Sequence, residues 1–395
     1  MWRNRNVWII LLGEFVVGLG LWAGIIGNLA FMQEVVPSDF YKSLIISIGI
    51  LAGLVVAPLA GRLIDQSKKK TVIQFASVGR IISVFFMFIA LYTNSVIWMI
   101  LFLITLQIAA AFYMPALQSI IPMVVKDQDL ITLNAWQMNA RTISRIVGTA
   151  AAGLMLSYFE LKWLYIISLI VYIIMYFITS ALKLDETVSV AVQGKDKGRF
   201  KEVLPMLKEH PVVLMTLVLM LIPTLFLGSF NLVIMKISEI HQSTTISGLL
   251  YTVEGIGFML GAAGLKYIAE RVKIGTLLFG LAFIIGLMEL MLLLADHTFF
   301  ALLTFGLFGF SVGCFFPTTM VIFQKQVPKE YYGRFFSFRN MIDSVVFQVV
   351  LLSTGMMLDL IGLNGMGLIF GIISLSLTVS FLFFSKKKNV IMHAQ

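Results

Sequence analysis

Charged residues are scarce in this sequence, and their scarcity excludes more classes of protein than any single motif does. Asp, Glu, Lys and Arg make up 12% of the 395 residues, whereas a soluble globular domain carries about 25%. The single cysteine, Cys314, rules out a disulfide framework. The phosphate-binding pattern Gly-x-x-x-x-Gly-Lys-Ser/Thr is missing, so ATP is not expected as an energy source. No nucleophile, base and orienting group share a readable spacing, so we do not expect an enzyme.

Long apolar runs fill most of the chain, which is 59% hydrophobic. The runs exceed strand length and lack the alternation of a barrel, so helices are the expected solution in lipid. The basic start, 1–6, precedes a run too long for a signal-peptide core, which we interpret as the first span. The predicted fold is an all-α membrane protein with twelve transmembrane helices, at 7–31, 42–61, 71–92, 96–123, 131–157, 162–183, 211–235, 245–267, 274–294, 298–322, 331–357 and 363–385.

The longest polar stretch, 185–210, divides these spans into six and six. We therefore predict an N-terminal half at 1–184, a partly helical cytoplasmic linker at 185–210, a C-terminal half at 211–386 and a cytoplasmic tail at 387–395. The four histidines fall in expected loops or tails, so neither a metal site nor a cofactor is expected.

Lysine and arginine are distributed very unevenly between the two ends of the predicted spans. If the N-terminus is inside, 22 of the 29 Lys and Arg residues lie on the cytoplasmic side, three lie outside and four lie within spans. This asymmetry predicts that both termini are cytoplasmic. The net charge of +9 does not indicate nucleic-acid binding, because the basic residues flank membrane spans.

The loop 61–70 reads Gly-Arg-Leu-Ile-Asp-Gln-Ser-Lys-Lys-Lys, and 264–273 is a weaker copy of it in the second half. Such internal repetition is typical of transporters built from two six-helix halves. With the stretches 111–118, 129–135 and 327–337, the sequence resembles the major facilitator superfamily. Within it, the sequence is similar to the drug:proton antiporter group that includes macrolide efflux proteins and enterobactin exporters.

The resemblance implies a cytoplasmic gate, and it also has departures. The gate would comprise Gly61, Asp65, Lys69, Lys70 and Arg334, with Asp65 at the N-terminal end of the eleventh span, where the helix dipole favours an acid. Lysines of this loop could instead be only solvated or lipid-facing. The family has other residues in place of Gln66, Ser67 and Lys68. The Gly-Pro-x-x-Gly-Gly motif that exporters of the superfamily carry in the fifth helix is replaced by Gly-Thr-Ala-Ala-Ala-Gly at 148–153.

Few charges fall inside the spans, where each costs at least about 2.5–3.5 kcal/mol unless it faces a cavity or a partner. We propose three acids as candidates for proton coupling: Glu14, Glu254 and Asp343. Glu14 is either a proton carrier or cation anchor, or an ion-pair partner of an arginine on the fifth helix. Glu289 needs only a hydroxyl or backbone partner.

Four arginines are candidates for a charge network or for substrate contact: Arg80, Arg141, Arg145 and Arg339. Arg141 and Arg145 share one helix face. The resemblance implies that they contact Glu254 across the two halves, either in a state-dependent or in a static way. Alternatively, they bind a carboxylate of the cargo. Arg339 and Asp343 are spaced to form an intrahelical pair, and Arg80 is expected to reach towards the cytoplasmic charges.

Aromatic side chains on the first, fourth, seventh and tenth helices are candidates for the wall of the central cavity that the resemblance implies: Trp22, Phe112, Tyr113, Phe226, Phe230 and Phe316. Aromatic and methionine walls suit amphiphilic cargo, although such residues also serve in packing or face lipid.

The expected function is proton-coupled export of a small amphiphilic molecule by alternating access, in the membrane of a bacterial cell. The cargo is either a drug-like compound or a siderophore-type or metallophore-type metabolite. The four arginines within the spans favour the metabolite. The expected partners are cargo, protons and lipid, and we expect a monomer driven by the proton gradient without a cofactor. The altered motif at 148–153 leaves a uniporter or importer open as an alternative, and a receptor that does not transport is the alternative of a different class.

Overall fold

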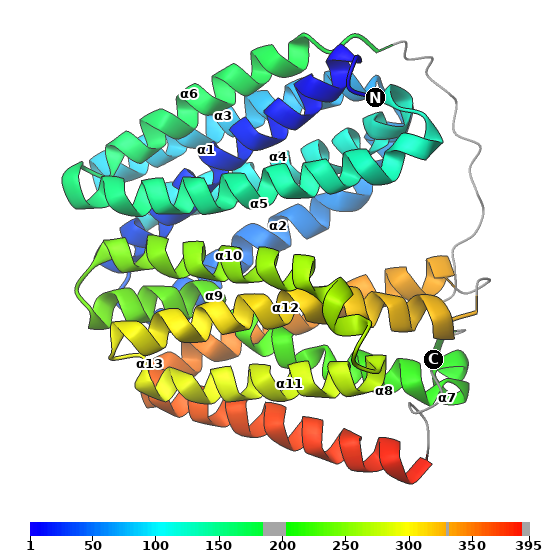
Figure 1. Ribbon diagram of the computed structural model, residues 1–395. Coiled ribbons are helices and arrows are strands. Elements are labelled where there is room, and N and C mark those ends of the chain that lie inside the picture. The colour runs from blue at the N-terminus through cyan, green and yellow to red at the C-terminus, as the bar shows by residue number, and fades with distance from the viewer. Residues whose placement is uncertain (185–202, 329–331, 389–395) are drawn as a thin grey trace. The chain divides into compact units, whose positions relative to one another are not determined.

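The computed structural model describes residues 1–184, 203–328 and 332–388 (Figure 1). Every regular element in these ranges is helical, and no strand occurs among them. The all-α prediction is confirmed. Lipid offers no hydrogen-bond partners to the backbone, and a helix satisfies its backbone N–H and C=O groups internally.

The helices follow one another with short connections. In chain order they are α1 (Arg5–Val35), α2 (Asp39–Gln66), α3 (Lys69–Thr93), α4 (Val96–Val124), α5 (Asp127–Tyr158), α6 (Lys162–Ser180), α7 (Val203–Glu209), α8 (Pro211–Leu219), α9 (Leu221–Ile240), α10 (Thr244–Ala269), α11 (Ile274–Met291), the 3₁₀ turn η2 (Leu292–Leu294), α12 (Thr298–Gln326) and α13 (Tyr332–Lys388). The linker predicted at 185–210 is described only in its last part, where α7 lies.

Twelve crossings result from these helices. Ten stretches are long and apolar enough to cross a membrane, and α8 and α9 together form one of them. The stretch Phe338–Ser385 has 48 residues, or about 72 Å of helix, enough for two crossings of a core of about 30 Å. Its two parts meet at Gly362, which has φ 70°. The remaining crossing is α5, whose charged residues lower its hydropathy.

The chain divides into two compact units. The first contains Met1–Pro37, Leu44–Gly194 and Ser243–Thr252, and the second contains Ser38–Ser43, Lys195–Gln242 and Val253–Gln395. The start of α2 therefore belongs to the second unit. Asp359 on α13 caps it there by accepting hydrogen bonds from the backbone N–H groups of Asp39 (2.8 Å) and Phe40 (3.0 Å) and from the Ser38 hydroxyl (2.6 Å). Free N–H groups at a helix start are thereby satisfied.

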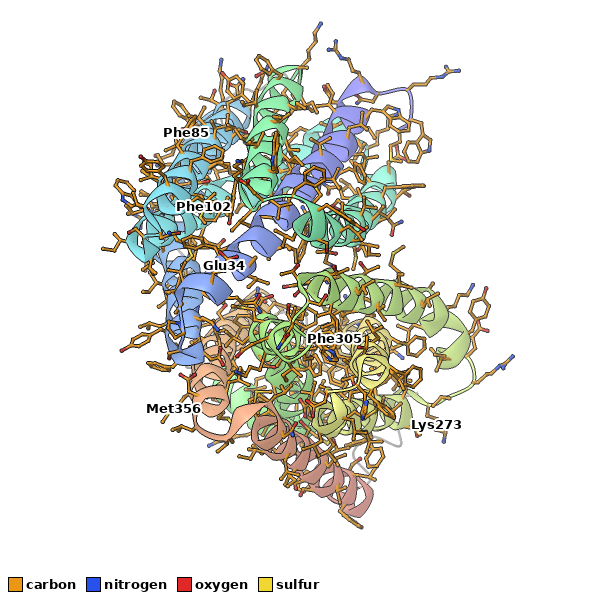
Figure 2. All side chains as sticks on the ribbon, turned by 90° about the vertical axis from the view of Figure 1, so that its left-hand side faces the viewer. Glu34, Phe85, Phe102, Lys273, Phe305 and Met356 are labelled. Atoms are coloured by element: carbon orange, nitrogen blue, oxygen red, sulfur yellow. The ribbon has the colours of Figure 1, made fainter. Side chains whose placement is uncertain are left out.

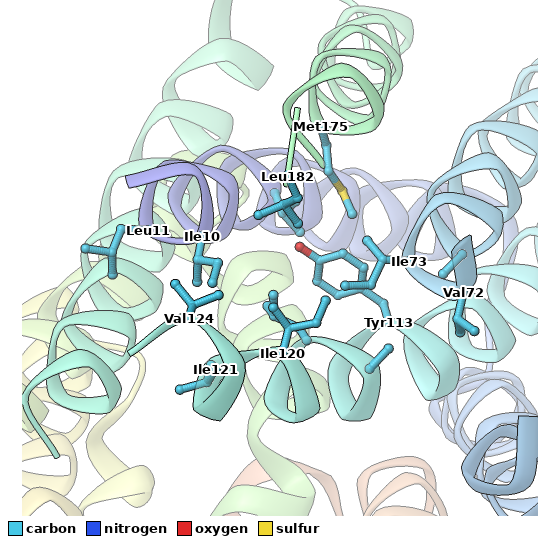
Figure 3. Packing of buried hydrophobic residues seen from close by; sticks show 14 of the residues in the cluster. Ile10, Leu11, Val72, Ile73, Tyr113, Ile120, Ile121, Val124, Met175 and Leu182 are labelled. Atoms are coloured by element: carbon cyan, nitrogen blue, oxygen red, sulfur yellow. The ribbon is translucent and has the colours of Figure 1, made fainter. Parts of the chain in front are cut away.

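Within the first unit, α1 packs against α5 and α6, and α3 packs against α4 and α6. One buried cluster joins α1, α3, α4 and α6 (Figure 3) and includes Ile10, Ile73, Tyr113, Ile120 and Met175. Apolar side chains also cover the outside of both units, as Phe85 and Met356 illustrate (Figure 2). This distribution fits a protein surrounded by lipid, where outer apolar surface is not a liability.

Within the second unit, glycines allow α10 and α12 to approach closely. A Cβ atom added at Gly261 would lie 2.1 Å from the Phe310 carbonyl oxygen, and one at Gly313 would lie 2.3 Å from that of Phe258. In a membrane the hydrophobic effect does not drive helices together, because lipid tails are as apolar as the side chains. Close packing therefore depends on small residues at the contact.

Candidate functional site

The seam between α1 and α5 brings two of the predicted charges together. Both guanidinium nitrogens Nε and Nη2 of Arg141 donate to the two carboxylate oxygens of Glu14, with the Nη2–Oε1 distance at 3.2 Å. The Glu14 side chain is 3% exposed and that of Arg141 is 38% exposed. The buried Glu14 carboxylate is thus paired with an Arg141 guanidinium that remains partly exposed. The geometry is that of the ion pair, one of the two roles predicted for Glu14.

Small residues at regular spacing along this seam explain why these two side chains meet. One turn after Glu14, a Cβ atom on Gly18 would lie 1.9 Å from the Ser144 hydroxyl oxygen. One turn further, a Cβ atom on Gly148 would lie 3.1 Å from the Trp22 Cβ atom. The Gly18 approach leaves no room for a Cβ atom, and the Gly148 approach is tight, so the altered motif at 148–153 still lies in a close helix contact. The fixed distance between the helices leaves the space that the Glu14–Arg141 pair fills.

A cavity of about 560 Å³, walled by both polar and apolar side chains, opens beside this pair, between α4 and α5. Arg141 forms part of its wall, together with the amide side chains of Gln118, Asn134 and Gln137. Gln137 is 4% exposed, and its amide nitrogen has no protein partner among the described residues. An unsatisfied buried donor costs about 1–3 kcal/mol. Sequence reasoning did not single out these amides.

Arg80 lies in an aromatic environment within the first unit. Its guanidinium carbon lies 4.5 Å from the Tyr113 ring centroid and 5.8 Å from that of Tyr172, and Nη1 lies 3.9 Å from the Met175 sulfur. The residue is 1% exposed and has no ion pair in the described part of the chain. The predicted reach towards the cytoplasmic charges is therefore not what the structure shows, because ring faces attract the cation instead.

Arg145 and Glu254 belong to different units. The Arg145 guanidinium carbon lies 5.9 Å from the Trp22 ring centroid, whose ring in turn packs against Tyr251 at 5.6 Å. Glu254 is buried on α10 in the second unit. The contact proposed between the helix-5 arginines and Glu254 remains a prediction.

Arg339 and Asp343 form the intrahelical ion pair that their spacing predicts, with 3.3 Å between Nε and Oδ2. The Arg339 guanidinium carbon also lies 5.1 Å from the Phe323 ring centroid. The cation beside it makes Asp343 a weaker candidate for proton exchange than an acid without a cation.

Glu289 is such an acid. It is 0% exposed on α11, with Ser374 of α13 as the polar side chain beside it. Neither carboxyl oxygen has a protein hydrogen-bond partner among the described residues. The sequence pointed to a hydroxyl neighbour for Glu289 but not to its isolation.

Three aromatic residues predicted to line a cavity lie in packed cores instead. Tyr113 is 1% exposed within the cluster of Figure 3. Phe226 and Phe230 are buried against Phe305, at ring-centroid distances of 5.3 and 5.2 Å. Within their units these rings fill space between helices, and their place in the wall of a central cavity remains a prediction.

The other three predicted aromatics are half-buried. Phe112 borders an apolar groove between α3 and α4, Phe316 packs edge-to-face on Phe315, and Trp22 lies in the seam described above.

The predicted gate loop is described only in part, because the side chains of Asp65 and Arg334 lie outside the described residues. The Nζ atom of Lys70 donates a hydrogen bond to the Leu182 carbonyl oxygen at 2.7 Å. This places a cation at the end of α6, where the helix dipole favours positive charge. Lys69 is half-buried, and Gly61 has open space around it. Lys70 thus ties the start of α3 to the end of α6, a role that the motif alone did not indicate.

Membrane-spanning helices that carry buried charges beside a cavity are typical of polytopic membrane transporters. Residues 10–349 match the Major Facilitator Superfamily. The chain belongs to this superfamily, which confirms the resemblance seen in the sequence, and it is a transporter rather than an enzyme.

Relatives and solved structures agree with this assignment. Macrolide efflux protein A of Streptococcus pyogenes is 24% identical over 372 residues, which cover 88% of each chain. Macrolide efflux protein A of Enterococcus faecalis is 24% identical over 325 residues, 76% of this chain and 96% of the relative. The crystal structure of the nucleoside transporter NupG has a TM-score of 0.76 at 14% identity, covering 96% of this chain and 98% of that one. The last match concerns the fold alone.

Proposed function

We propose that the protein exports a small amphiphilic molecule from a bacterial cell in exchange for protons, by alternating access. Two relatives are named as efflux proteins, at 24% identity over most of the chain, which supports the direction. The observation that carries the proposal is the ion pair between the buried Glu14 and the half-exposed Arg141, which forms part of a cavity wall. The protein would act as a monomer in the cell membrane with both termini in the cytoplasm.

The pair suggests how a proton and a cargo could compete. When a proton binds Glu14, its carboxyl loses the charge that attracts Arg141, so the bidentate contact weakens. The guanidinium, already 38% exposed, is then available to an acceptor on the cargo. Conversely, cargo that engages Arg141 competes with the Glu14 carboxylate for the same guanidinium. Such reciprocity is what coupling between two ligands requires.

The cargo itself is either a drug-like compound or an anionic or zwitterionic metabolite of the metal-chelating type. The cavity wall supports an amphiphile, because the amides of Gln118 and Gln137 face the same space as Ile121 and Leu130. Arg141 would favour an acceptor-rich cargo. A uniporter or importer on the same fold is the alternative, and it would move cargo without the opposing proton flux.

The test uses purified full-length protein in liposomes that contain a pH-sensitive dye. Addition of a macrolide or of an iron-free siderophore should change the internal pH, and Glu14→Gln or Glu254→Gln should abolish that change. Glu160→Gln is the matched control, because Glu160 has a lysine partner, Lys162, but is 73% exposed. If both buried-acid variants couple as well as Glu160→Gln does, the assignment of the proton carrier is wrong. Cargo flux without any pH change would favour the uniporter.

A further inference from the structure

A groove of about 540 Å³ lies between α11 and the last part of α13, away from the Glu14–Arg141 site and within the second unit. Its walls are mainly apolar, with Phe279 and Phe283 from α11 and Val379 and Leu382 from α13. Phe283 is 44% exposed and Val379 is 41% exposed. The volume is within the range of small-molecule sites, and the chemistry of the walls suits a hydrocarbon chain.

Glycine decides where the two helices touch and where they leave space. Around Gly286 and Gly371 they are in close contact, since a Cβ atom added there would lie 3.0 Å from Leu375 Cδ2 and 2.5 Å from Leu290 Cδ2, respectively. At Gly280, which lines the groove, an added Cβ atom would meet nothing within 4 Å. The groove is therefore open at Gly280, where no side chain fills it, and it ends where α11 and α13 pack tightly around Gly286 and Gly371.

A positive charge stands at the mouth of this groove. Lys273 directly precedes α11, lines the groove and is exposed (Figure 2). No acid pairs with it in the described part of the chain. The hydroxyl-bearing residues Thr276 and Ser385 line the same groove. This is the end of the helices that carries the basic loops, the predicted cytoplasmic side. An apolar channel that ends at a cation and hydroxyl groups complements a molecule with an acyl chain and an anionic head.

We propose that this groove binds one anionic phospholipid of the cytoplasmic leaflet, with an acyl chain along Phe279 and Val379 and its phosphate at Lys273. A lysine near an anionic lipid surface contributes about 1 kcal/mol, which corresponds to about a fivefold preference for an anionic over a zwitterionic headgroup. The acyl contacts hold lipids of either kind, and Lys273 selects between them.

The experiment measures the phospholipid retained by detergent-purified full-length protein with native mass spectrometry. Phosphatidylglycerol and phosphatidylcholine with identical chains are supplied in equal amounts. Wild-type protein should retain phosphatidylglycerol about fivefold more than phosphatidylcholine, and Lys273→Gln should remove that preference. Gly280→Leu should reduce retention of both lipids, because leucine occupies the groove without a clash at Cβ.

Two matched controls accompany these variants. Lys266→Gln removes a charge at the same end of the protein but outside the groove, and Gly264→Leu adds the same side chain where a Cβ atom also meets nothing within 4 Å. Both should behave as wild type. Equal retention of the two lipids by wild type would overturn the proposal, as would unchanged retention by Gly280→Leu. Displacement of the lipid by soluble glycerol phosphate would show a phosphate site rather than a lipid site and would also overturn it.

Discussion

Removing either partner of the Glu14–Arg141 pair should destabilise the protein unequally. Glu14 is 3% exposed and Arg141 is 38% exposed. A fully buried charge that loses its partner costs about 3–5 kcal/mol. For Arg141→Met the open side of the cavity screens part of this cost, so we expect a loss of about 2–3 kcal/mol. Glu14→Gln leaves a cation that can still be hydrated, and it should cost about 1 kcal/mol.

The chain offers a convenient probe for this measurement. Cys314 is the single cysteine of the sequence, and it is 0% exposed, so a thiol-reactive dye should label it only when the second unit opens. Thermal unfolding followed by this dye should show a larger decrease in midpoint for Arg141→Met than for Glu14→Gln. Their double variant should lose less than the sum of the two, because residues in one ion pair couple.

Two results would refute this reasoning. One is a midpoint that falls as far for Glu14→Gln as for Arg141→Met, since the argument depends on the unequal burial of the two side chains. The other is additivity within about 0.5 kcal/mol, which would mean that the two groups do not interact. A separate assay of retained secondary structure by circular dichroism shows whether labelling of Cys314 reports unfolding of the whole chain.

Three further predictions concern stability in the same assay. Gly18→Ala should cost about 1–3 kcal/mol through overpacking, because its Cβ atom would lie 2.6 Å from the Ser144 Cβ atom, whereas Gly264→Ala should be neutral or slightly stabilising. Gly362→Ala should cost about 1–3 kcal/mol through backbone strain alone, since φ is 70° and the added atom meets nothing; a neutral result would contradict the break assigned to α13. Asp359→Ala should cost about 1–2 kcal/mol through loss of the cap on α2, and Asp359→Asn should recover part of it; equal losses in both variants would exclude the capping role.

Local spacing predicted the features that depend on residues close in the chain. Apolar runs of about 20 residues predicted the helices, and the spacing of Arg339 and Asp343 predicted their ion pair, because residues four apart share a helix face whatever the rest of the fold does. The sequence also predicted separate spans at 331–357 and 363–385, although only the backbone showed that they meet at Gly362, where φ is 70°.

The partners of the buried charges could not be predicted in the same way. Arg141 and Arg145 are equivalent in spacing, yet Arg141 pairs with Glu14 and the Arg145 guanidinium lies near the Trp22 ring. The difference follows from the rotation of α5 against α1, which the glycine contacts along the seam set. Arg80 faces Tyr113 for a similar reason.

What the sequence alone determined is the number of spans, their helical nature and the superfamily, since lipid permits few other solutions for such apolar runs. What only the tertiary structure decided is which long-range contacts form, such as Asp359 with Ser38, 321 positions apart, and Lys70 with Leu182, 112 apart. Side chains this distant meet only after helices pack, and packing depends on the shapes of whole helix faces rather than on any short pattern.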